Sequence, residues 1–231
     1  MSQAAVELRG IARRFGRRWV LRGVDLDAHG GEAIGLTGRN GSGKTTLLRI
    51  CATLLRPTRG GGRIFGADLV TDAASIRLRV GYLAHDAGLY ANLTAAENLM
   101  FAQRMAGHRV DLDAIGWALD EVGLARERGE RVRGFSSGMR RRLALARLLL
   151  RPPSLLLLDE PYASFDVDGV DRVNEFAVQI KAAGGIVLIA THDLRRALPV
   201  IDRHVSINDG RLADRDLVEI EAWAAAEEGS P

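Results

Sequence analysis

The nine residues GRNGSGKTT, from Gly38 to Thr46, constrain the fold of this chain more than any other stretch. They follow the apolar run EAIGL, and their last three residues begin KTTLLRICATLL, in which apolar residues recur three and four positions apart. Glycines let backbone N–H groups curl around an anion, and the start of a helix adds a field that favours negative charge. The stretch therefore predicts a phosphate-binding loop between a β-strand and an α-helix, and hence an α/β fold.

The side chains of this loop suit a nucleotide. Lys44, one of two lysines in a chain rich in arginine, offers a compact positive charge to the β- and γ-phosphates, and the Thr45 hydroxyl can bind Mg²⁺. The loop residues expected to contact the nucleotide are Gly38, Asn40, Gly41, Ser42, Gly43, Lys44, Thr45 and Thr46. An ordinary glycine turn is the alternative, because the bare pattern arises by chance in about one such chain in a hundred.

A second stretch, SLLLLDEPYASFD, supplies the other half of the predicted site. Its apolar strand pattern ends at Asp159, which places a carboxylate at the carboxyl edge of the sheet, where α/β proteins bind ligands and where it can hold Mg²⁺. Glu160, the next residue, can orient the attacking water or take its proton. In isolation the same letters would fit a solvated strand exit. Together with the loop, they predict that the chain binds and hydrolyses a nucleotide.

The pattern along the chain indicates one α/β domain, residues 1–231, with a helical insertion. Short alternating runs before the loop read as strands, and after a Gly-rich turn GRIFGADL and RVGYLAH read as strands again. From Thr94, apolar spacings of three and four in TAAENLMFAQRMA, DLDAIGWALDEVGL and GMRRRLALARLLL predict a helical subdomain at about residues 88–150. The strands LLLLD, GIVLIATH and HVSIND follow, with a helix between the first two. A short helical tail is expected at about residues 214–231.

Composition excludes several classes of protein. Apolar runs fall short of the roughly 18 to 20 residues that span a bilayer, and the N-terminus lacks the apolar core of a signal peptide, so we expect a cytoplasmic chain. The single cysteine, Cys51, rules out an internal disulfide, and five scattered histidines do not suggest a metal cluster. Net charge is +3 with acidic residues interspersed among the basic ones, so no direct contact with nucleic acid is expected.

Five stretches in order, GRNGSGKTT, FSSGM, LLLLDEP, ASFD and IATHD, resemble the Walker A, signature, Walker B, D-loop and switch-histidine motifs of ABC transporter ATP-binding subunits. The resemblance covers about residues 4–212. It implies a P-loop NTPase core of the ABC ATPase type, with an N-terminal antiparallel β subdomain and the inserted helical subdomain. It also implies ATP and Mg²⁺ as ligands, and an ATPase activity coupled to transport across a membrane.

In this family the signature motif binds ATP that is held by the Walker A loop of a second subunit. The resemblance therefore assigns Ser136 and the backbone of Ser137 and Gly138 to a neighbour's γ-phosphate, beside the N-terminus of the helix that follows. Serine before a helix is also a common N-cap, and the two roles are compatible. One chain carries one Walker set and one signature, so a complete site needs two chains arranged head to tail. The arginines at positions 140–142 are expected to form a solvated helix face.

Four further positions are assigned through the family. Phe15 matches the aromatic residue that stacks on adenine, with Trp19 as the alternative and a core role for either left open. His192 matches the histidine that touches the γ-phosphate and helps to position the water, and Asp166 matches the aspartate that links the two sites of the dimer. His85 stands where the family has glutamine. Histidine binds Mg²⁺ only when it is neutral and correctly oriented, so the metal role of His85 is left open.

Within the family, His85 together with LYANLTAAENL, SSGMRRRLALARLLL and DEPYASFD is similar to the ATP-binding subunit of the haem-exporter complex of cytochrome c maturation. That resemblance implies integral membrane transport subunits as partners and a peripheral position on the cytoplasmic face of the inner membrane. An exporter of drugs, lipids or polysaccharide is the nearest alternative. A soluble ABC ATPase of DNA repair or translation is disfavoured, because only 51 positions separate His85 from Ser136 and no second Walker loop exists. A P-loop kinase or GTPase would give no role to FSSGM, and the chain contains no N-K-x-D motif.

Overall fold

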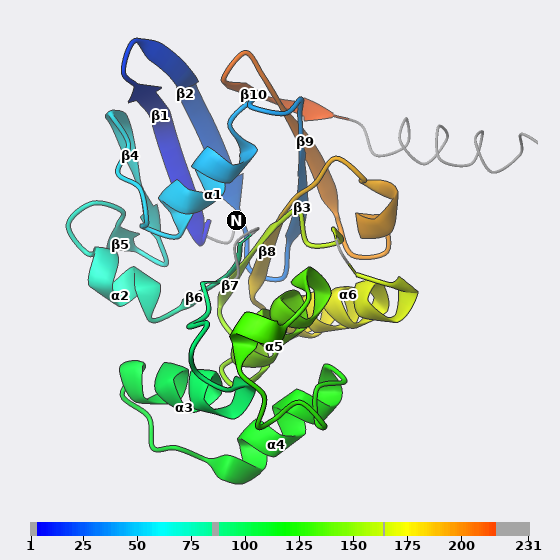
Figure 1. Cartoon of the computed structure of the whole chain (residues 1–231). Helices are drawn as coiled ribbons and strands as arrows, with labels where there is room; N and C mark the ends of the chain where they lie inside the picture. The colour runs from blue at the N-terminus through cyan, green and yellow to red at the C-terminus, as the bar shows by residue number, and fades with distance from the viewer. Residues whose placement is uncertain (1–3, 85–87, 164, 216–231) are drawn as a thin grey trace, which may run out of the picture.

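The computed structural model describes residues 4–84, 88–163 and 165–215, and this part of the chain folds into two β-sheets with helices around them (Figure 1). The strands are β1 (Val6–Phe15), β2 (Arg18–Ala28), β3 (Ala33–Thr37), β4 (Arg59–Ile64), β5 (Ala67–Asp68), β6 (Val80–Leu83), β7 (Leu155–Asp159), β8 (Ile186–Ala190), β9 (Arg203–Asn208) and β10 (Arg211–Arg215). The helices are α1 (Lys44–Cys51), α2 (Ala73–Arg77), α3 (Ala95–Met105), α4 (Leu112–Glu121), α5 (Ser137–Leu149) and α6 (Val167–Ala182), with short 3-10 turns at Val132–Gly134 and Arg195–Ala197.

The central sheet has six strands in the order β10-β9-β3-β8-β7-β6. All of its ladders are parallel except the β9–β10 hairpin. Strands β7 and β8 are buried along their whole length, as expected for parallel strands covered on both faces. Alternate side chains of β7 enter different cores, with Leu155 and Leu157 on the side of α1, and Leu156 and Leu158 on the side of the inserted helices.

The N-terminal third forms the second sheet, antiparallel, in the order β2-β1-β4-β5. Helix α1 lies between this sheet and the central one (Figure 1). Gly60 and Gly61, predicted as a turn before the strand GRIFGADL, are part of strand β4. A Cβ on Gly62 would lie 2.1 Å from the Glu7 carbonyl oxygen of β1, and one on Gly60 would lie 2.2 Å from that of Gly10. Gly60 and Gly62 are therefore required by the close approach of the two backbones, and the prediction of a turn at the start of β4 is wrong.

Helices α3, α4 and α5 lie together at the end of the molecule opposite the antiparallel sheet (Figure 1). Leu99, Ile115 and Leu143, one from each helix, are fully buried in one core with Leu156 and Leu158 of β7. Helix α3 begins with a capping box, in which the Thr94 side chain and the N3 glutamate satisfy each other's backbone N–H groups. None of the helices in the described ranges has the length and apolar character needed to cross a membrane.

The predicted fold class is confirmed, with an antiparallel sheet from the N-terminal third, a largely parallel central sheet, and helices inserted between β6 and β7. The strand predicted over GRIFGADL is divided into the end of β4 and the short strand β5, and sequence patterns did not predict β10 or helix α2. The expected helical tail lies almost entirely outside the described residues. The carboxyl ends of β3, β7 and β8 meet at one edge of the central sheet, which is the edge at which the predicted site residues are found.

Candidate active site

The loop that joins β3 to α1 adopts a conformation that only glycine permits at two of its positions. Gly38 and Gly43 have φ angles of 145° and 119°. A Cβ on Gly38 would lie 2.5 Å from the carbonyl oxygen of Ile207, and one on Gly43 would lie 2.6 Å from Cδ2 of Leu21. The loop therefore curls tightly against β2 and β9 before α1 begins at Lys44.

A cavity of about 320 Å³ opens over this loop. Its walls are formed by Arg18, Val20, Asn40, Gly41, Ser42, Gly43, Lys44, Thr45, Thr46 and Glu160. Lys44 is 7% exposed, and its Nζ donates a hydrogen bond of 2.8 Å to the Gly38 carbonyl oxygen. The Oγ atom of Ser42 is buried and finds no partner within the described part of the chain, and α1 has no acidic residue in its first turn. A buried cation, an unsatisfied hydroxyl and a helix N-terminus suit the oxygens of a phosphate chain.

Asp159, at the end of β7, lies next to the first turn of α1. It is 1% exposed, its Oδ1 accepts a hydrogen bond of 2.9 Å from the Thr45 hydroxyl, and its Oδ2 accepts one of 2.9 Å from Tyr82 Oη. Burial, and then the charge of Asp159, raise the pKa of Tyr82, so that Tyr82 keeps its proton and its donor role. Tyr82 was not among the residues predicted from the sequence. The available signal was a tyrosine within the apolar strand β6, which pairs with β7 and places Tyr82 opposite Leu157.

Thr45 and Asp159 have the chemistry to hold Mg²⁺. Their oxygens are the hard ligands that this ion prefers, and Mg²⁺ commonly takes only one or two protein ligands beside phosphate and water. The Thr45 hydroxyl gives its hydrogen to the carboxylate, which leaves its lone pairs for a cation. Across the described residues there is no cluster of three or more histidine, cysteine or acidic side chains that would suit a metal ion. His85, the third predicted metal ligand, lies outside the described residues.

Glu160 and His192 come together from the ends of neighbouring strands. The Glu160 Oε2 atom is 2.7 Å from Nδ1 of His192 and accepts a second hydrogen bond, of 3.2 Å, from the His192 backbone N–H. The other carboxylate oxygen lies 3.8 Å from Lys44 Nζ. Glu160 has a left-handed φ of 49°, and its own N–H bonds to the Ala190 carbonyl oxygen at 2.7 Å. A strained glutamate held by two neighbouring segments is typical of a functional site.

The predicted signature residues do not line this cavity in their own chain. Ser136 is the N-cap of α5, and its Oγ accepts a hydrogen bond of 3.2 Å from the Met139 N–H. Ser136 and Ser137 are exposed, and Gly138 is half-buried. Asp166 likewise caps α6 by accepting a hydrogen bond of 3.0 Å from the Gly169 N–H. Both motifs therefore have the structural roles of helix caps, and contacts with a second subunit remain a prediction.

The prediction of a solvated helix face at positions 140–142 is wrong for Arg141. Arg140 is exposed and Arg142 is half-buried, whereas Arg141 is 4% exposed and turns toward β7. Its guanidinium donates to the main-chain oxygens of Asp159 and Ala163. In a helix, residues one position apart point about 100° away from each other, so a run of three arginines cannot share one face.

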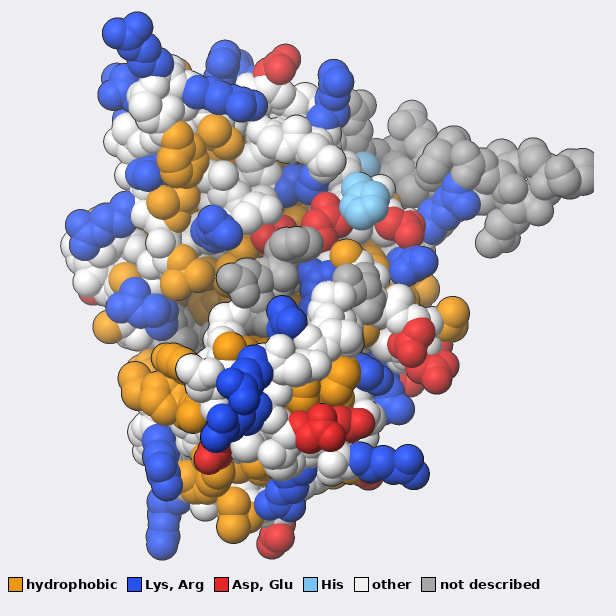
Figure 2. Space-filling view, in the orientation of Figure 1, with side chains coloured by type: hydrophobic (Ala, Val, Ile, Leu, Met, Phe, Trp, Pro, Cys, Tyr) orange, Lys and Arg blue, Asp and Glu red, His pale blue; other side chains and the backbone are white. Residues whose placement is uncertain are grey.

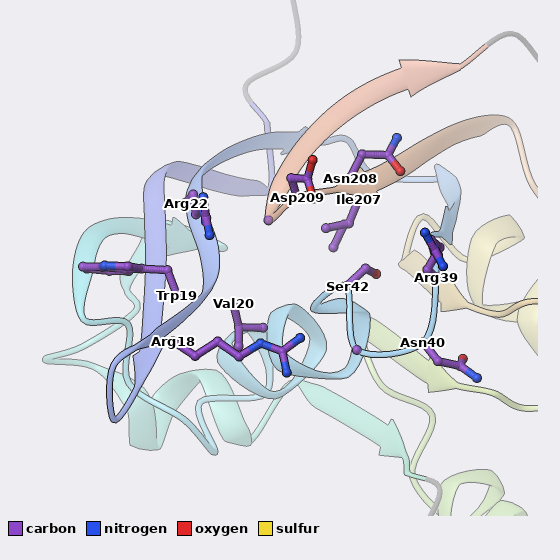
Figure 3. Close-up of a pocket in the computed structure, with 12 residues that line it drawn as sticks. Arg18, Trp19, Val20, Arg22, Arg39, Asn40, Ser42, Ile207, Asn208 and Asp209 are labelled. Atoms are coloured by element: carbon purple, nitrogen blue, oxygen red, sulfur yellow. The ribbon is translucent and has the colours of Figure 1, made fainter.

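A second cavity, of about 500 Å³, lies between β2, the phosphate-binding loop and the β9–β10 turn (Figure 3). Arg18, Arg22 and Arg39 contribute its cationic side chains, and Trp19 also lines it. Phe15 lines neither this cavity nor the one over the loop. Phe15 is 46% exposed, and the Arg13 guanidinium lies 4.7 Å from the centroid of its ring. Both Phe15 and Trp19 therefore remain candidates for stacking on the adenine ring.

Comparison with known proteins agrees with this arrangement. The ABC transporter family model matches residues 21–163. The cytochrome c biogenesis ATP-binding export protein CcmA 2 of Cupriavidus metallidurans is 38% identical over 83% of this chain and 91% of its own length. The daunorubicin resistance ATP-binding protein DrrA3 of Streptomyces coeruleorubidus is 36% identical over 92% of this chain and 68% of its own. A solved structure of the ATP binding subunit of an ABC transporter aligns with a TM-score of 0.83 and 29% identity, covering 96% of this chain and 93% of that one.

The family model spans more than half of the chain, and the similarity to the CcmA 2 protein extends over nearly all of that relative. The chain therefore belongs to the ABC transporter family, as an ATP-binding subunit whose ATP hydrolysis is coupled to transport.

Proposed function

We propose that this chain is the ATP-hydrolysing motor of a membrane exporter that serves cytochrome c biogenesis. One observation carries the proposal: the similarity to a cytochrome c biogenesis export protein extends over almost the whole length of that relative. A motor with a different cargo is the second candidate, because a daunorubicin resistance protein is similar over an even larger share of this chain but over a smaller share of its own.

The chain's own residues would bind ATP through the loop at Gly38 to Thr46. Backbone N–H groups and Ser42 Oγ would bind phosphate oxygens, and Lys44 would exchange its bond to the Gly38 carbonyl for the β- and γ-phosphates. Thr45 and Asp159 would hold Mg²⁺, which neutralises charge that develops on the phosphates during transfer. Phe15, at the end of β1, is the residue assigned to the adenine ring.

Glu160 is the residue assigned to the water. Its carboxylate would accept a proton as the water oxygen attacks the γ-phosphorus, and the bond to the ADP oxygen breaks as the new bond forms. His192 donates to the same carboxylate oxygen from its backbone N–H and lies within hydrogen-bond distance through its ring, which fixes the direction in which Glu160 points. His192 is 71% exposed, which leaves its ring accessible to the γ-phosphate.

The predicted composite site requires a second ATP-binding subunit arranged head to tail. Ser136, Ser137 and Gly138 are exposed or half-buried at the start of α5, where a partner's γ-phosphate can reach them. Asp166 lies at the start of α6, in the segment that follows Glu160, and is assigned to the link between the two sites. Integral membrane transport subunits would complete the complex, with this chain peripheral on the cytoplasmic face of the inner membrane.

Replacing Lys44 by alanine in source cells tests the cargo. The variant would replace the only copy of the gene, and covalently bound c-type cytochromes would be detected by haem staining beside the wild type. We expect those bands to disappear while the variant protein remains at its normal level. Normal cytochrome bands, with ATP hydrolysis abolished in the purified variant, would leave an ABC motor that serves another cargo.

A further inference from the structure

Arg141 connects the start of α5 with the loop that carries Glu160. Helix α5 begins at the segment from Ser136 to Gly138, and Arg141 lies one turn further along. Its side chain is 4% exposed, whereas most arginines on this chain are exposed or half-buried. Burial lowers the pKa of Arg141, although the charges of Asp159 and Glu160 act in the opposite direction. A desolvated guanidinium is costly, so its bonding partners indicate what holds it there.

Those partners are main-chain oxygens on both sides of Glu160. The Arg141 Nη1 donates a hydrogen bond of 2.5 Å to the Ala163 carbonyl oxygen, and Nη2 donates one of 3.1 Å to the Asp159 carbonyl oxygen. Among the ion pairs of the described residues, none includes Arg141. The Arg141 side chain therefore holds a short backbone segment, residues 159–163, through hydrogen bonds at its two ends, and does not neutralise one particular carboxylate.

The segment that Arg141 holds contains a residue with an unusual backbone conformation. Glu160 lies inside it with a left-handed φ of 49°, a conformation that persists only where the surroundings impose it. The Glu160 N–H bond to Ala190 fixes this segment from the side of β8, and Arg141 fixes it from the side of α5. A shift of α5 by a fraction of an ångström would therefore move both anchored carbonyls and reorient Glu160 relative to His192.

We infer that Arg141 is a positioning residue that makes the orientation of Glu160 depend on the position of the α5 N-terminus. The inference rests on the proposed composite site. When Ser136, Ser137 and Gly138 engage a partner's nucleotide, α5 moves as a rigid helix, and Arg141 transmits that movement to the backbone on both sides of Glu160. Capture of the partner's nucleotide at one end of α5 is thereby coupled to the alignment of the base in the same chain.

The test compares Arg141→Met with Arg142→Met. Methionine keeps much of the length and apolar stem of arginine but cannot donate hydrogen bonds, and the second variant removes a neighbouring guanidinium that is only half-buried. We expect Arg141→Met to bind a fluorescent ATP analogue within about twofold of the wild type, because the residue does not line the nucleotide cavity. Its kcat should fall roughly tenfold or more, since a small misplacement of a catalytic group has effects of that size.

Two further readouts separate positioning from general stability. Cooperativity of hydrolysis in ATP concentration should be lost in Arg141→Met, and Arg141→Lys should restore part of kcat because ammonium can donate to one of the two carbonyls. Arg142→Met should leave both quantities unchanged. Should Arg141→Met fail to fold, the lysine variant carries the test, with a reduced kcat at unchanged ATP affinity as the expected result.

Equal kcat in the wild type and either Arg141 variant would overturn the inference, as would a parallel loss of ATP affinity and kcat in folded Arg141 variants. These outcomes differ from failure of the proposed function. If the wild-type chain neither bound nor hydrolysed ATP, the motor assignment itself would fall, whatever the Arg141 variants did.

Discussion

Glu160 Oε2 and His192 Nδ1 lie 2.7 Å apart although 32 positions separate the two residues in the chain. The parallel pairing of β7 with β8 produces this contact. Asp159 lies opposite Ala190, Glu160 comes directly after Asp159, and His192 comes two positions after Ala190. In the proposed reaction Glu160 is the base, and the contact with His192 determines which carboxylate oxygen of Glu160 faces the attacking water.

His192→Ala is therefore expected to lower kcat by roughly tenfold or more, while ATP affinity stays within about twofold of the wild type. The exposed His29, in the turn between β2 and β3, provides a matched control as His29→Ala. Steady-state ATPase rates and equilibrium nucleotide binding measure the two quantities. Equal rates for the two alanine variants would remove His192 from the reaction.

The two candidate adenine platforms can be separated by substitution. Stacking of a base on an aromatic ring contributes about 1–3 kcal/mol, so Phe15→Ala should raise the Kd for ATP by roughly fivefold or more. Trp19→Ala should have little effect, since Phe15 is the position that matches the adenine-stacking residue of the family and the Trp19 ring lies near the Arg14 and Arg59 guanidinium groups. Binding of inorganic tripolyphosphate, which has no base, should be the same in both variants. The reverse order of Kd values would assign the base to Trp19.

Cys51 reports on opening of the core between α1 and the two sheets. Burial raises the pKa of its thiol to about 12, and the thiolate is the form that reacts with iodoacetamide. In the unfolded chain the thiol ionises near its ordinary pKa of about 8.5, so the folded state should lose stability as pH rises above that value toward 12. At pH 8 the native chain should resist alkylation and the urea-unfolded chain should react once. Rapid alkylation of the native chain, as followed by mass spectrometry, would contradict the buried position.

The sequence predicted those features that depend on local constraints. Glycine spacing in the loop before Lys44 fixed a phosphate-binding geometry, and the apolar run that ends at Asp159 placed a carboxylate at the sheet edge. Contacts between segments far apart in the chain have no such local pattern in the sequence. Tyr82 bonds to Asp159 only because β6 pairs with β7, and the burial of Arg141 depends on how α5 packs against the same strand. The turn predicted at the start of β4 was wrong for the same reason, because the need for glycine at positions 60 and 62 comes from the backbone of β1.

In the proposed complex, two ATP-binding subunits arranged head to tail form the complete ATP site. Glu160→Gln should bind Mg-ATP but not hydrolyse it, since the amide cannot take the proton, so the ATP-bound form should accumulate. We would measure its mass by light scattering after size-exclusion chromatography, with Mg-ATP and with Mg-ADP. We predict a mass about twice the monomer value of 25.1 kDa with Mg-ATP, and the monomer with Mg-ADP. A monomer that carries bound ATP at saturating concentration would contradict the composite site.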